Sequence, residues 1–273
     1  QQNRFTKSHK LDGRLEYYYM LSNLASLNVT LGTTQVSQDF DSNMGDFEND
    51  EFRVFQEQHL NNNARHEFSD LYTALRYRVK KGKLTFNPGL TFHKYDISTY
   101  QATTRNTNET KVLPDVWISY QLRNSETLRF TYKAQLQYTD VSRLAAAYTF
   151  NNYNRLYIGN PELNPAYFNN FTLNYFNFNM FNFTNIFVRL NYRKQFDTFK
   201  TVNTLNGINR ESSPFNAPKA EERISLRGRL QKRFNNVKTS FTLRADKNTS
   251  YNIVNDALRR FDYFTQFGSA SIA

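Results

Sequence analysis

Oxygen-bearing side chains alternate at the start of the acidic segment DFDSNMGDFENDE, residues 39 to 51. Asp39, Asp41 and Asn43 have the every-other-residue spacing with which a calcium loop supplies hard oxygen ligands. Gly45 lies one place later than an EF-hand loop requires, and the twelfth position holds Asp50 in place of Glu. The segment therefore predicts a solvated loop, and a calcium site at Asp39, Asp41 and Asn43 is the alternative.

Histidines are the other residues that could bind a metal or transfer protons. The chain has four of them and no cysteine, and they show no metal-binding spacing: His9, His59, His66 and His93. The sequence contains no serine elbow, phosphate-binding loop or paired-carboxylate motif. We therefore expect no enzyme, no catalytic residue, no cofactor and no resident metal.

The elements that must position any functional residue are strands. In TLRFTYKAQLQY, residues 127 to 138, every second side chain from Leu128 to Tyr138 is apolar or aromatic, and polar side chains fill the places between. This period of two is typical of strands and recurs along the chain. It predicts about eleven strands, at residues 8–20, 25–38, 66–80, 83–98, 111–123, 126–139, 166–178, 183–197, 219–233, 237–250 and 260–272.

The connections between these strands alternate in length. Short turns are expected at residues 21–24, 80–83, 123–126, 179–182 and 234–237, and long polar loops at 39–62, 100–110, 140–165, 198–218 and 251–258. Several strands are long enough to cross a bilayer, which takes ~9–11 residues of tilted strand. Short turns on one side and long loops on the other are typical of an outer-membrane barrel, with the turns in the periplasm.

The cost of placing charge in lipid decides which face of the sheet is which. An Arg or Lys at the bilayer midplane costs ~2–4 kcal/mol, so Arg129 and Lys133 are expected to face a wet lumen while the Leu, Phe and Tyr face meets lipid. The predicted fold class is all-β, an antiparallel transmembrane β-barrel. Pro88 lies in mid-strand on the apolar face and cannot donate a ladder hydrogen bond, so a bulge or break is expected there.

Basic residues account for the net charge of +11 and are expected to line the lumen. The residues placed there are Arg76, Arg78, Arg129, Lys133, Arg189, Arg193, Arg223, Arg227, Arg229 and Arg244. They would either attract an anionic ligand or, the favoured interpretation, form salt bridges to neighbouring strands and hydrogen bonds to a plug in the lumen. A binder of single-stranded nucleic acid needs aromatic and basic side chains in one groove. The alternation separates them onto opposite faces, so no nucleic-acid partner is expected.

The segment RLYIGNPELNPAYFNNFTLNYFNF, residues 155 to 178, resembles the loop-to-strand signature of TonB-dependent outer-membrane receptors. Five positions match the signature, and Ala166 stands where the family usually has Glu: Gly159, Asn160, Pro161, Leu163 and Pro165. Two prolines fix an extended approach to the strand, and Gly159 is expected to allow the turn before it. The resemblance implies a barrel of 22 strands whose lumen is plugged by an N-terminal domain. Residues 1–273 are then expected to be a single unit of about half a barrel, without the plug.

The resemblance also implies a function and partners. It implies uptake of a nutrient such as a sugar, peptide or chelate across the bacterial outer membrane, with outer-membrane lipid, the plug, an inner-membrane energy-coupling protein and a surface lipoprotein as expected partners. Loop residues Tyr148, Tyr153, Tyr157 and Asn160 are expected to contact the substrate, although aromatic loop residues often only hold loops together. The alternatives are a passive pore or a structural or secretion-associated barrel, and then a soluble β-rich surface-binding protein.

Overall fold

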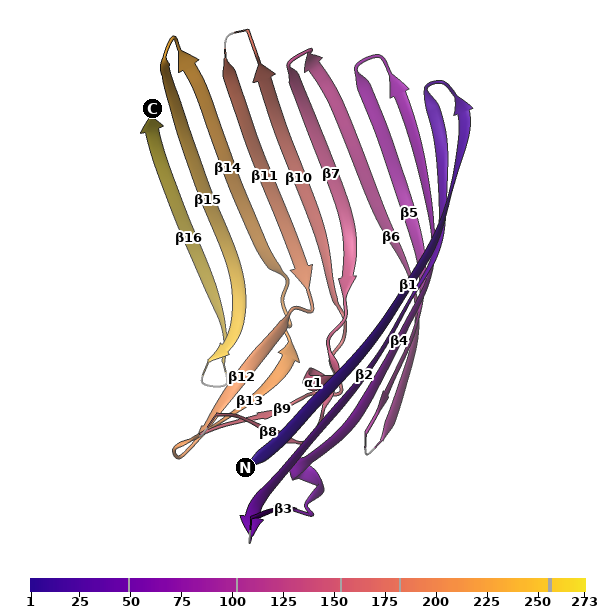
Figure 1. The fold of residues 1–273 in the computed structure, drawn as a ribbon, viewed down its shortest axis with the longest axis vertical. Coiled ribbons are helices and arrows are strands. Elements are labelled where there is room, and N and C mark those ends of the chain that lie inside the picture. Colours follow the sequence, from indigo (N-terminus) through magenta and orange to yellow (C-terminus); the bar gives the residue numbers. More distant parts are fainter. Residues whose placement is uncertain (49, 102, 153, 182, 255–256) are drawn as a thin grey trace.

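The computed structural model describes residues 1–273 except 49, 102, 153, 182 and 255–256. Most of the described chain forms one antiparallel sheet of 12 strands, in the order β1-β2-β4-β5-β6-β7-β10-β11-β14-β15-β16, with β3 attached to β2 (Figure 1). The strands are β1 (Gln2–Ser22), β2 (Ala25–Glu48), β3 (Glu51–Val54), β4 (Asn61–Lys81), β5 (Leu84–Tyr100), β6 (Thr104–Arg123), β7 (Glu126–Gln137), β10 (Ala166–Asn179), β11 (Thr184–Phe196), β14 (Glu221–Phe234), β15 (Val237–Val254) and β16 (Ala257–Ile272). Without β3, eleven described strands remain, one for each predicted range.

The predicted short turns are confirmed over their described residues, which exclude 182, and they lie at one end of the sheet, the turn end (Figure 1). Two of them show how the sequence closes a tight hairpin. Gly82, between β4 and β5, has φ 56°, and Asn235, between β14 and β15, has φ 48°. Gly and Asn adopt this left-handed conformation more readily than other residues, which is why they occur in two-residue hairpins.

The opposite end of the sheet, the loop end, contains structure that the period-two pattern does not predict. A 3-10 helix, η1 (Gln58–Leu60), and a short helix, α1 (Val141–Leu144), lie in two of the expected loops. A second sheet, of four strands, is built from β8 (Tyr148–Asn152), β9 (Arg155–Ile158), β12 (Phe199–Asn206) and β13 (Asn209–Asn216). The predicted loops 39–62, 100–110 and 251–258 are partly wrong, since β2, β4, β6, β15 and β16 continue into them.

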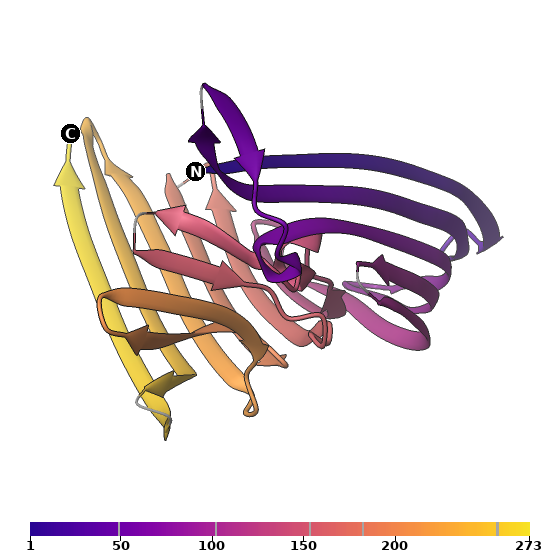
Figure 2. The ribbon, with the colours of Figure 1, turned by 90° about the horizontal axis from the view of Figure 1, so that it is seen from below.

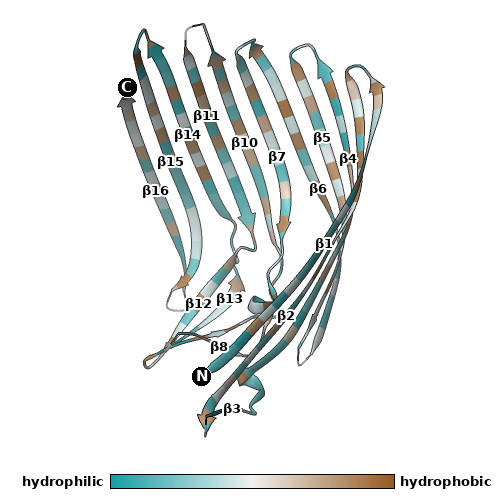
Figure 3. Cartoon of the chain, in the orientation of Figure 1, coloured by the Kyte–Doolittle hydropathy of each residue, from teal (hydrophilic) through white to brown (hydrophobic). Residues whose placement is uncertain are grey.

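The two faces of the main sheet differ as predicted. Val29, Leu75 and Leu90 are register partners on three neighbouring strands, and Leu75 and Leu90 are 45% and 44% exposed. The polar positions form matching rows on the opposite face, where Asn174 pairs with Arg129 on one side and with Arg189 on the other. Figure 3 shows the resulting alternation of hydrophobic and hydrophilic bands along the strands. Pleating therefore sorts apolar from polar side chains across the sheet.

The sheet is strongly curved and open. Viewed from the loop end in Figure 2, the sheet is bent, with indigo β1 on one edge and yellow β16 on the other, and the four-stranded sheet crosses this end. The polar rows lie on the concave face, which is called the inner face here. No helix in the described part of the chain has the length and apolar character that a membrane span requires.

Two prolines modify the sheet. At Pro88 the predicted break is partial: the β4–β5 register skips the positions between Arg76/Gly89 and Val79/Phe86, but it resumes unshifted and β5 is continuous. Pro114 has a larger effect. Toward the loop end, the last pair of the β6–β7 ladder is Asp115/Lys133. The next residue of β6 in that direction is Pro114, which has no N–H to donate.

Beyond that point β7 separates from β6, and its apolar side chains no longer face outward. The Tyr138 ring lies 4.8 Å from Phe68 and 5.0 Å from Tyr95. Ala134 is only 2% exposed. The prediction that the whole apolar row from Leu128 to Tyr138 meets lipid is therefore wrong for Ala134 and Tyr138, because Pro114 releases the strand that carries them.

Candidate functional site

The inner loop, residues 138–165, lies at the loop end and is hydrogen-bonded to the inner face of the sheet. The side-chain amide of buried Asn62 of β4 bonds to the loop backbone as a neighbouring strand would. Its Nδ2 donates to the carbonyl of Ala147 (3.1 Å), and its Oδ1 accepts the Ala147 N–H (2.9 Å). Gln101 adds a second contact, since its Oε1 accepts the Ala146 N–H (2.8 Å) and its Nε2 donates to Asn62 Oδ1 (3.0 Å). The Asn62 amide thus satisfies two Ala147 backbone groups that would otherwise be buried without partners.

Helix α1 anchors the start of the inner loop. Asp140 caps it by accepting the Arg143 N–H (3.2 Å), and the Val141 N–H donates to Gln38 Oε1 of β2 (3.1 Å). Val141 and Ala145 form a small apolar core with Phe40 and Ala64, all of them at most 2% exposed. The helix is too short to be stable alone, so its contacts with the sheet must stabilise it.

The Gly-Asn-Pro segment closes the inner loop. Gly159 donates its N–H to Ala145 O (2.9 Å) and Asn160 donates its N–H to Arg143 O (2.7 Å). A Cβ on Gly159 would lie 2.5 Å from Ala145 O and 2.7 Å from Arg143 O. Glycine is therefore needed here for a close approach between backbones, whereas the sequence predicted that it allows a turn.

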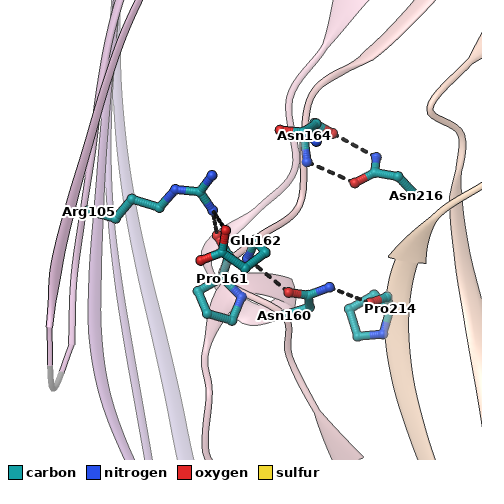
Figure 4. Close-up of polar contacts among 7 residues, drawn as sticks. All are labelled: Arg105, Asn160, Pro161, Glu162, Asn164, Pro214 and Asn216. Carbon is teal, nitrogen blue, oxygen red and sulfur yellow. Dashed lines mark hydrogen bonds and ion pairs between the residues drawn. The ribbon is translucent and has the colours of Figure 1, made fainter.

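Figure 4 shows how the rest of this segment is held. Arg105 of β6 donates to the Pro161 carbonyl and forms an ion pair with Glu162 (3.2 Å). Asn160 Nδ2 donates to Pro214 O (3.1 Å), and its Oδ1 accepts the Glu162 N–H (2.8 Å). The Asn160 side chain thus joins the inner loop to β13 through Nδ2 and fixes the loop's own backbone through Oδ1.

The hairpin of β12 and β13 is fixed beside the inner loop. Asn164 donates its N–H to Asn216 Oδ1, and Asn216 Nδ2 donates to Asn164 O, both at 2.8 Å (Figure 4). At the base of the hairpin, Lys200 Nζ lies 2.8 Å from Glu221, whose Oε1 also accepts the Tyr251 N–H (2.8 Å). This hairpin lies within the predicted loop 198–218 and was not predicted. The asparagine contacts were not predicted either, because they join residues far apart in the sequence.

The predicted substrate-contact residues lie in different surroundings. Tyr157 of β9 lines a cavity at the loop end, and burial raises its pKa to about 12. Tyr148 of β8 packs edge-on against His59 at 6.3 Å, and burial, together with the charge of Glu211 and a hydrogen bond to it, raises its pKa. Tyr153 lies outside the described residues.

The predicted basic residues lie on the inner face, but few of them have acidic partners. Arg76 bonds to Asp115 (3.3 and 3.4 Å) and Arg223 to Asp246 (3.1 Å). Lys133 lines an inner cavity of about 420 Å³ together with Arg76 and Asp115. Arg78, Arg129, Arg189, Arg193, Arg227, Arg229 and Arg244 form no ion pair with any described residue within 4.0 Å. The predicted cross-strand salt bridges thus account for a minority of these cations.

Three of these arginines form a row across neighbouring strands. Arg189 of β11 is the register partner of Arg227 of β14, which in turn pairs with Arg244 of β15. Like charges directly opposite one another destabilise a sheet. The three arginines therefore concentrate positive charge on this part of the inner face.

Aromatic side chains share the inner face with some of these cations, so their predicted separation is wrong here. The Arg129 guanidinium lies 5.5 Å from the ring of Trp117 and 5.5 Å from that of Phe176. Arg193 lies 4.0 Å from the ring of Phe168. Because Trp117, Phe168 and Phe176 occupy inward positions, the strand pleat brings rings and cations together.

The candidate metal-binding and acid–base residues are dispersed. His93 Nδ1 contacts Asp70 (2.9 Å) and His66 Nδ1 contacts Thr99 (2.9 Å), while His9 lies on exposed β1. Among the described residues, no three His, Cys, Asp or Glu side chains are grouped so that they could hold a metal ion. Asp39, Asp41 and Asn43 stand in β2, which pairs with both β1 and β4, so the segment is an extended strand and not the solvated loop or EF-hand loop considered from the sequence.

Comparisons with known proteins give the same architecture. The family model described as "Outer membrane protein beta-barrel family" matches residues 1–269. No curated protein matches the sequence.

Three solved structures are similar in fold. The Serratia marcescens hemophore receptor HasR has a TM-score of 0.65 at 11% identity, over 99% of this chain and 49% of that one. The copper transporter OprC has a TM-score of 0.64 at 11% identity, over 91% and 39%. The ferric citrate transporter FecA has a TM-score of 0.61 at 10% identity, over 97% and 42%. The chain thus spans half or less of these structures, and the resemblance to TonB-dependent receptors stated from the sequence is confirmed for the fold.

Proposed function

The chain belongs to the outer membrane protein β-barrel family, and on that premise we propose that it forms part of the wall and the extracellular mouth of a receptor that takes up a nutrient. The family is one of the bacterial outer membrane, which agrees with the apolar outer face. In the proposed orientation the turn end faces the periplasm and the loop end faces the outside of the cell. Residues 1–273 act as one unit of the barrel wall.

The observation that carries this proposal is the position of the inner loop. It is held inside the mouth by Asn62 of β4, by Gln101 of the β5–β6 connection and by Arg105 of β6. A solute that enters from the loop end therefore meets preorganised polar and aromatic side chains at the entrance. Preorganised groups bind with a smaller entropy loss than mobile ones, as a receptor requires.

The inner wall supports a partner in the lumen. The row of Arg189, Arg227 and Arg244 lacks carboxylate partners among the described residues, so we propose that it faces acidic side chains of a plug domain that belongs to the same protein. Coupled uptake then also needs an inner-membrane energy-coupling protein. Outer-membrane lipid on the apolar face and a surface lipoprotein over the mouth complete the proposed partners.

For the substrate, we propose a nutrient captured at the mouth: a sugar, a peptide or a chelate. The printed names of the similar structures mention heme, copper and ferric citrate, which supports the chelate among these classes. No catalytic step is proposed. The transported molecule leaves the receptor chemically unchanged.

Uptake by cells that produce the full-length protein tests this function against the alternatives. The proposed receptor predicts saturable accumulation that stops when the inner-membrane proton gradient is dissipated. A passive pore would instead admit small solutes in proportion to their concentration, with or without the gradient. A structural or secretion-associated barrel would leave uptake unchanged when its gene is deleted.

A further inference from the structure

A cavity of about 280 Å³ lies at the loop end between β1, β2, the inner loop and the β12–β13 hairpin. Its volume is near the lower end of the ~300–1,000 Å³ typical of ligand sites, so it fits a small molecule. The residues that line it include Arg4, Arg143, Lys200, Thr149, Tyr157 and Phe199. They come from segments that are distant in the sequence, and the inner-loop contacts bring them together.

Two of the cations are held over aromatic rings. The guanidinium of Arg4 lies 5.5 Å from the ring centre of buried Phe40, and that of Arg143 lies 5.7 Å from the ring centre of Phe199. Cation–π contacts fix the orientation of a guanidinium without using its hydrogen-bond donors. Those donors remain available to a ligand in the cavity.

The charge around the cavity is not balanced by the described residues. Lys200 is paired with Glu221 (2.8 Å), and Arg143 is weakly paired with Asp140 (3.8 Å). Arg4 forms no ion pair with any described residue. No acidic side chain of the described chain lines the cavity itself.

Hydroxyl groups add neutral donors. Ser142 donates to Asp140 and Thr149 donates to Tyr157 O (3.2 Å), so these two protons are used within the protein. Tyr157 and Thr201 bring hydroxyls to the same cavity. The Tyr157 hydroxyl is protonated at neutral pH, since burial raises its pKa further above neutrality, to about 12, and it can therefore donate a hydrogen bond.

From these contacts we infer that the cavity binds a small polyanion through its carboxylate or phosphate oxygens, with Arg4 and Arg143 as the principal ligands and Tyr157 as a hydrogen-bond donor. Guanidinium groups suit such oxygens because they donate paired hydrogen bonds in one plane. The inference deepens the proposed function, since it names the substrate class at the mouth of the receptor. It accounts for an unpaired Arg4, a weakly paired Arg143 and a hydroxyl donor that converge on a cavity whose described lining contains no carboxylate.

The test is calorimetry on the purified full-length protein, with citrate and inorganic phosphate as anionic probes and glucose as a neutral probe. Each of Arg4→Gln and Arg143→Gln is expected to weaken binding of the preferred anion by about ten-fold or more. Lys7→Gln, which removes a cation from an outward position of β1, is expected to leave it unchanged. Tyr157→Phe is expected to weaken binding by about three-fold to ten-fold.

Folding of each variant is checked by its heat-dependent electrophoretic migration, and the unmodified protein gives a second readout. Its affinity for the anion is expected to fall as salt concentration rises. Equal affinity in the parent, Arg4→Gln and Arg143→Gln would overturn the inference, as would binding of glucose and of neither anion. Citrate binding alone identifies a carboxylate ligand, and phosphate binding alone a phosphate ligand.

Failure of this inference can be distinguished from failure of the proposed function. Energy-dependent uptake by a protein that binds neither anion would overturn the polyanion site and leave the receptor in place. Uptake that is independent of the proton gradient, together with loss of anion binding in Arg4→Gln, would support the polyanion site and overturn the proposed receptor function.

Discussion

Asn62 pairs with Ala147 as one strand pairs with another: its side-chain amide both donates to and accepts from the Ala147 backbone, at 3.1 and 2.9 Å. Asn62 is 1% exposed and Ala147 is 3% exposed, so water cannot replace these bonds. Asn216 makes the same two contacts with Asn164. Two asparagine amides thus extend β-type hydrogen bonding from the sheet and the hairpin to the inner loop, on which the proposed site depends.

Replacing Asn62 by alanine is expected to release the inner loop while the barrel wall stays folded. The change leaves the N–H and the carbonyl of Ala147 buried without hydrogen-bond partners, which costs about 1–3 kcal/mol for each group. Limited proteolysis of intact cells should then show faster cleavage within residues 138–165. Asn63→Ala is the matched control on an exposed neighbouring position, and equal cleavage in the two variants would contradict the assigned role.

Gly159→Ala is expected to dislodge the same loop by a different mechanism. The new Cβ would meet backbone atoms of Ala145 and Arg143, which cannot rotate away as a side chain can. Overpacking of this kind costs about 1–3 kcal/mol. Hydrogen exchange at Gly159 and Asn160 should accelerate. At Gly268 an added Cβ meets no atom within 4 Å, so Gly268→Ala should leave this exchange unchanged.

Acidification is expected to loosen the inner loop through His66. This residue lies at the loop end of β4, outside the apolar part of the strand. Its neighbours Arg65 and Glu67, at outward positions, form an ion pair (2.7 Å). Burial lowers the pKa of His66 below its ordinary value of 6.5, and the charge of Asp140 opposes the shift in part. The unfolded chain therefore takes up the proton first. The contribution of His66 to the stability of the folded state is fully present above pH 6.5 and is lost as the pH falls toward the pKa of His66 in the folded protein.

Cleavage of the inner loop should accordingly increase as the pH falls below about 6.5. His66→Gln should weaken that dependence, whereas His9→Gln, on exposed β1, should keep it. A dependence that persists undiminished in His66→Gln would assign the effect to another group.

A charge on the outer face is expected to destabilise the barrel. Leu190, in the middle of β11, is 41% exposed and lies in register with Leu173 and Leu226. Leu190→Arg should cost about 2–4 kcal/mol if this position faces lipid. Ser269→Arg, at an inward position of β16, should cost less. Urea unfolding of the full-length protein in lipid vesicles measures both, and equal costs would be inconsistent with the assigned faces.

The long strands were predictable because lipid and lumen impose opposite demands on successive side chains of one strand. The pattern fails where that demand ends. Along the loop-end half of β2, Asp39 and Asp41 occupy outward positions, so the alternation disappears although the backbone ladder continues to Asn43. Hydrogen bonding between backbones does not depend on side-chain polarity, so the polarity pattern does not show where a ladder ends. Observed strands such as β2 are therefore longer than the predicted ones.

The candidate site was only partly predictable. The Gly-Asn-Pro signature marked the inner loop, and Tyr157, predicted to contact the substrate, lines the cavity at the loop end. Arg4 and Lys200 were not identified, because their convergence on one cavity depends on contacts between distant segments such as Asn164 and Asn216. Local patterning carries no signal for such contacts. The aromatic partners of Arg129 were missed for a related reason, since single inward rings such as Trp117 do not change the period of a strand.

The two-sided wall is tested most directly by spin labels along β11. These 273 residues contain no cysteine, so single cysteines at positions 185 to 191 can be labelled in the full-length protein in lipid vesicles, after replacement of any cysteine elsewhere. Accessibility to oxygen, which concentrates in lipid, should peak at 186, 188 and 190. Labels at the inward positions 185, 187, 189 and 191 should instead be accessible to a water-soluble nickel complex, or inaccessible to both oxygen and the nickel complex. Oxygen accessibility that peaks at 189 and 191, or that shows no period of two, would contradict the account.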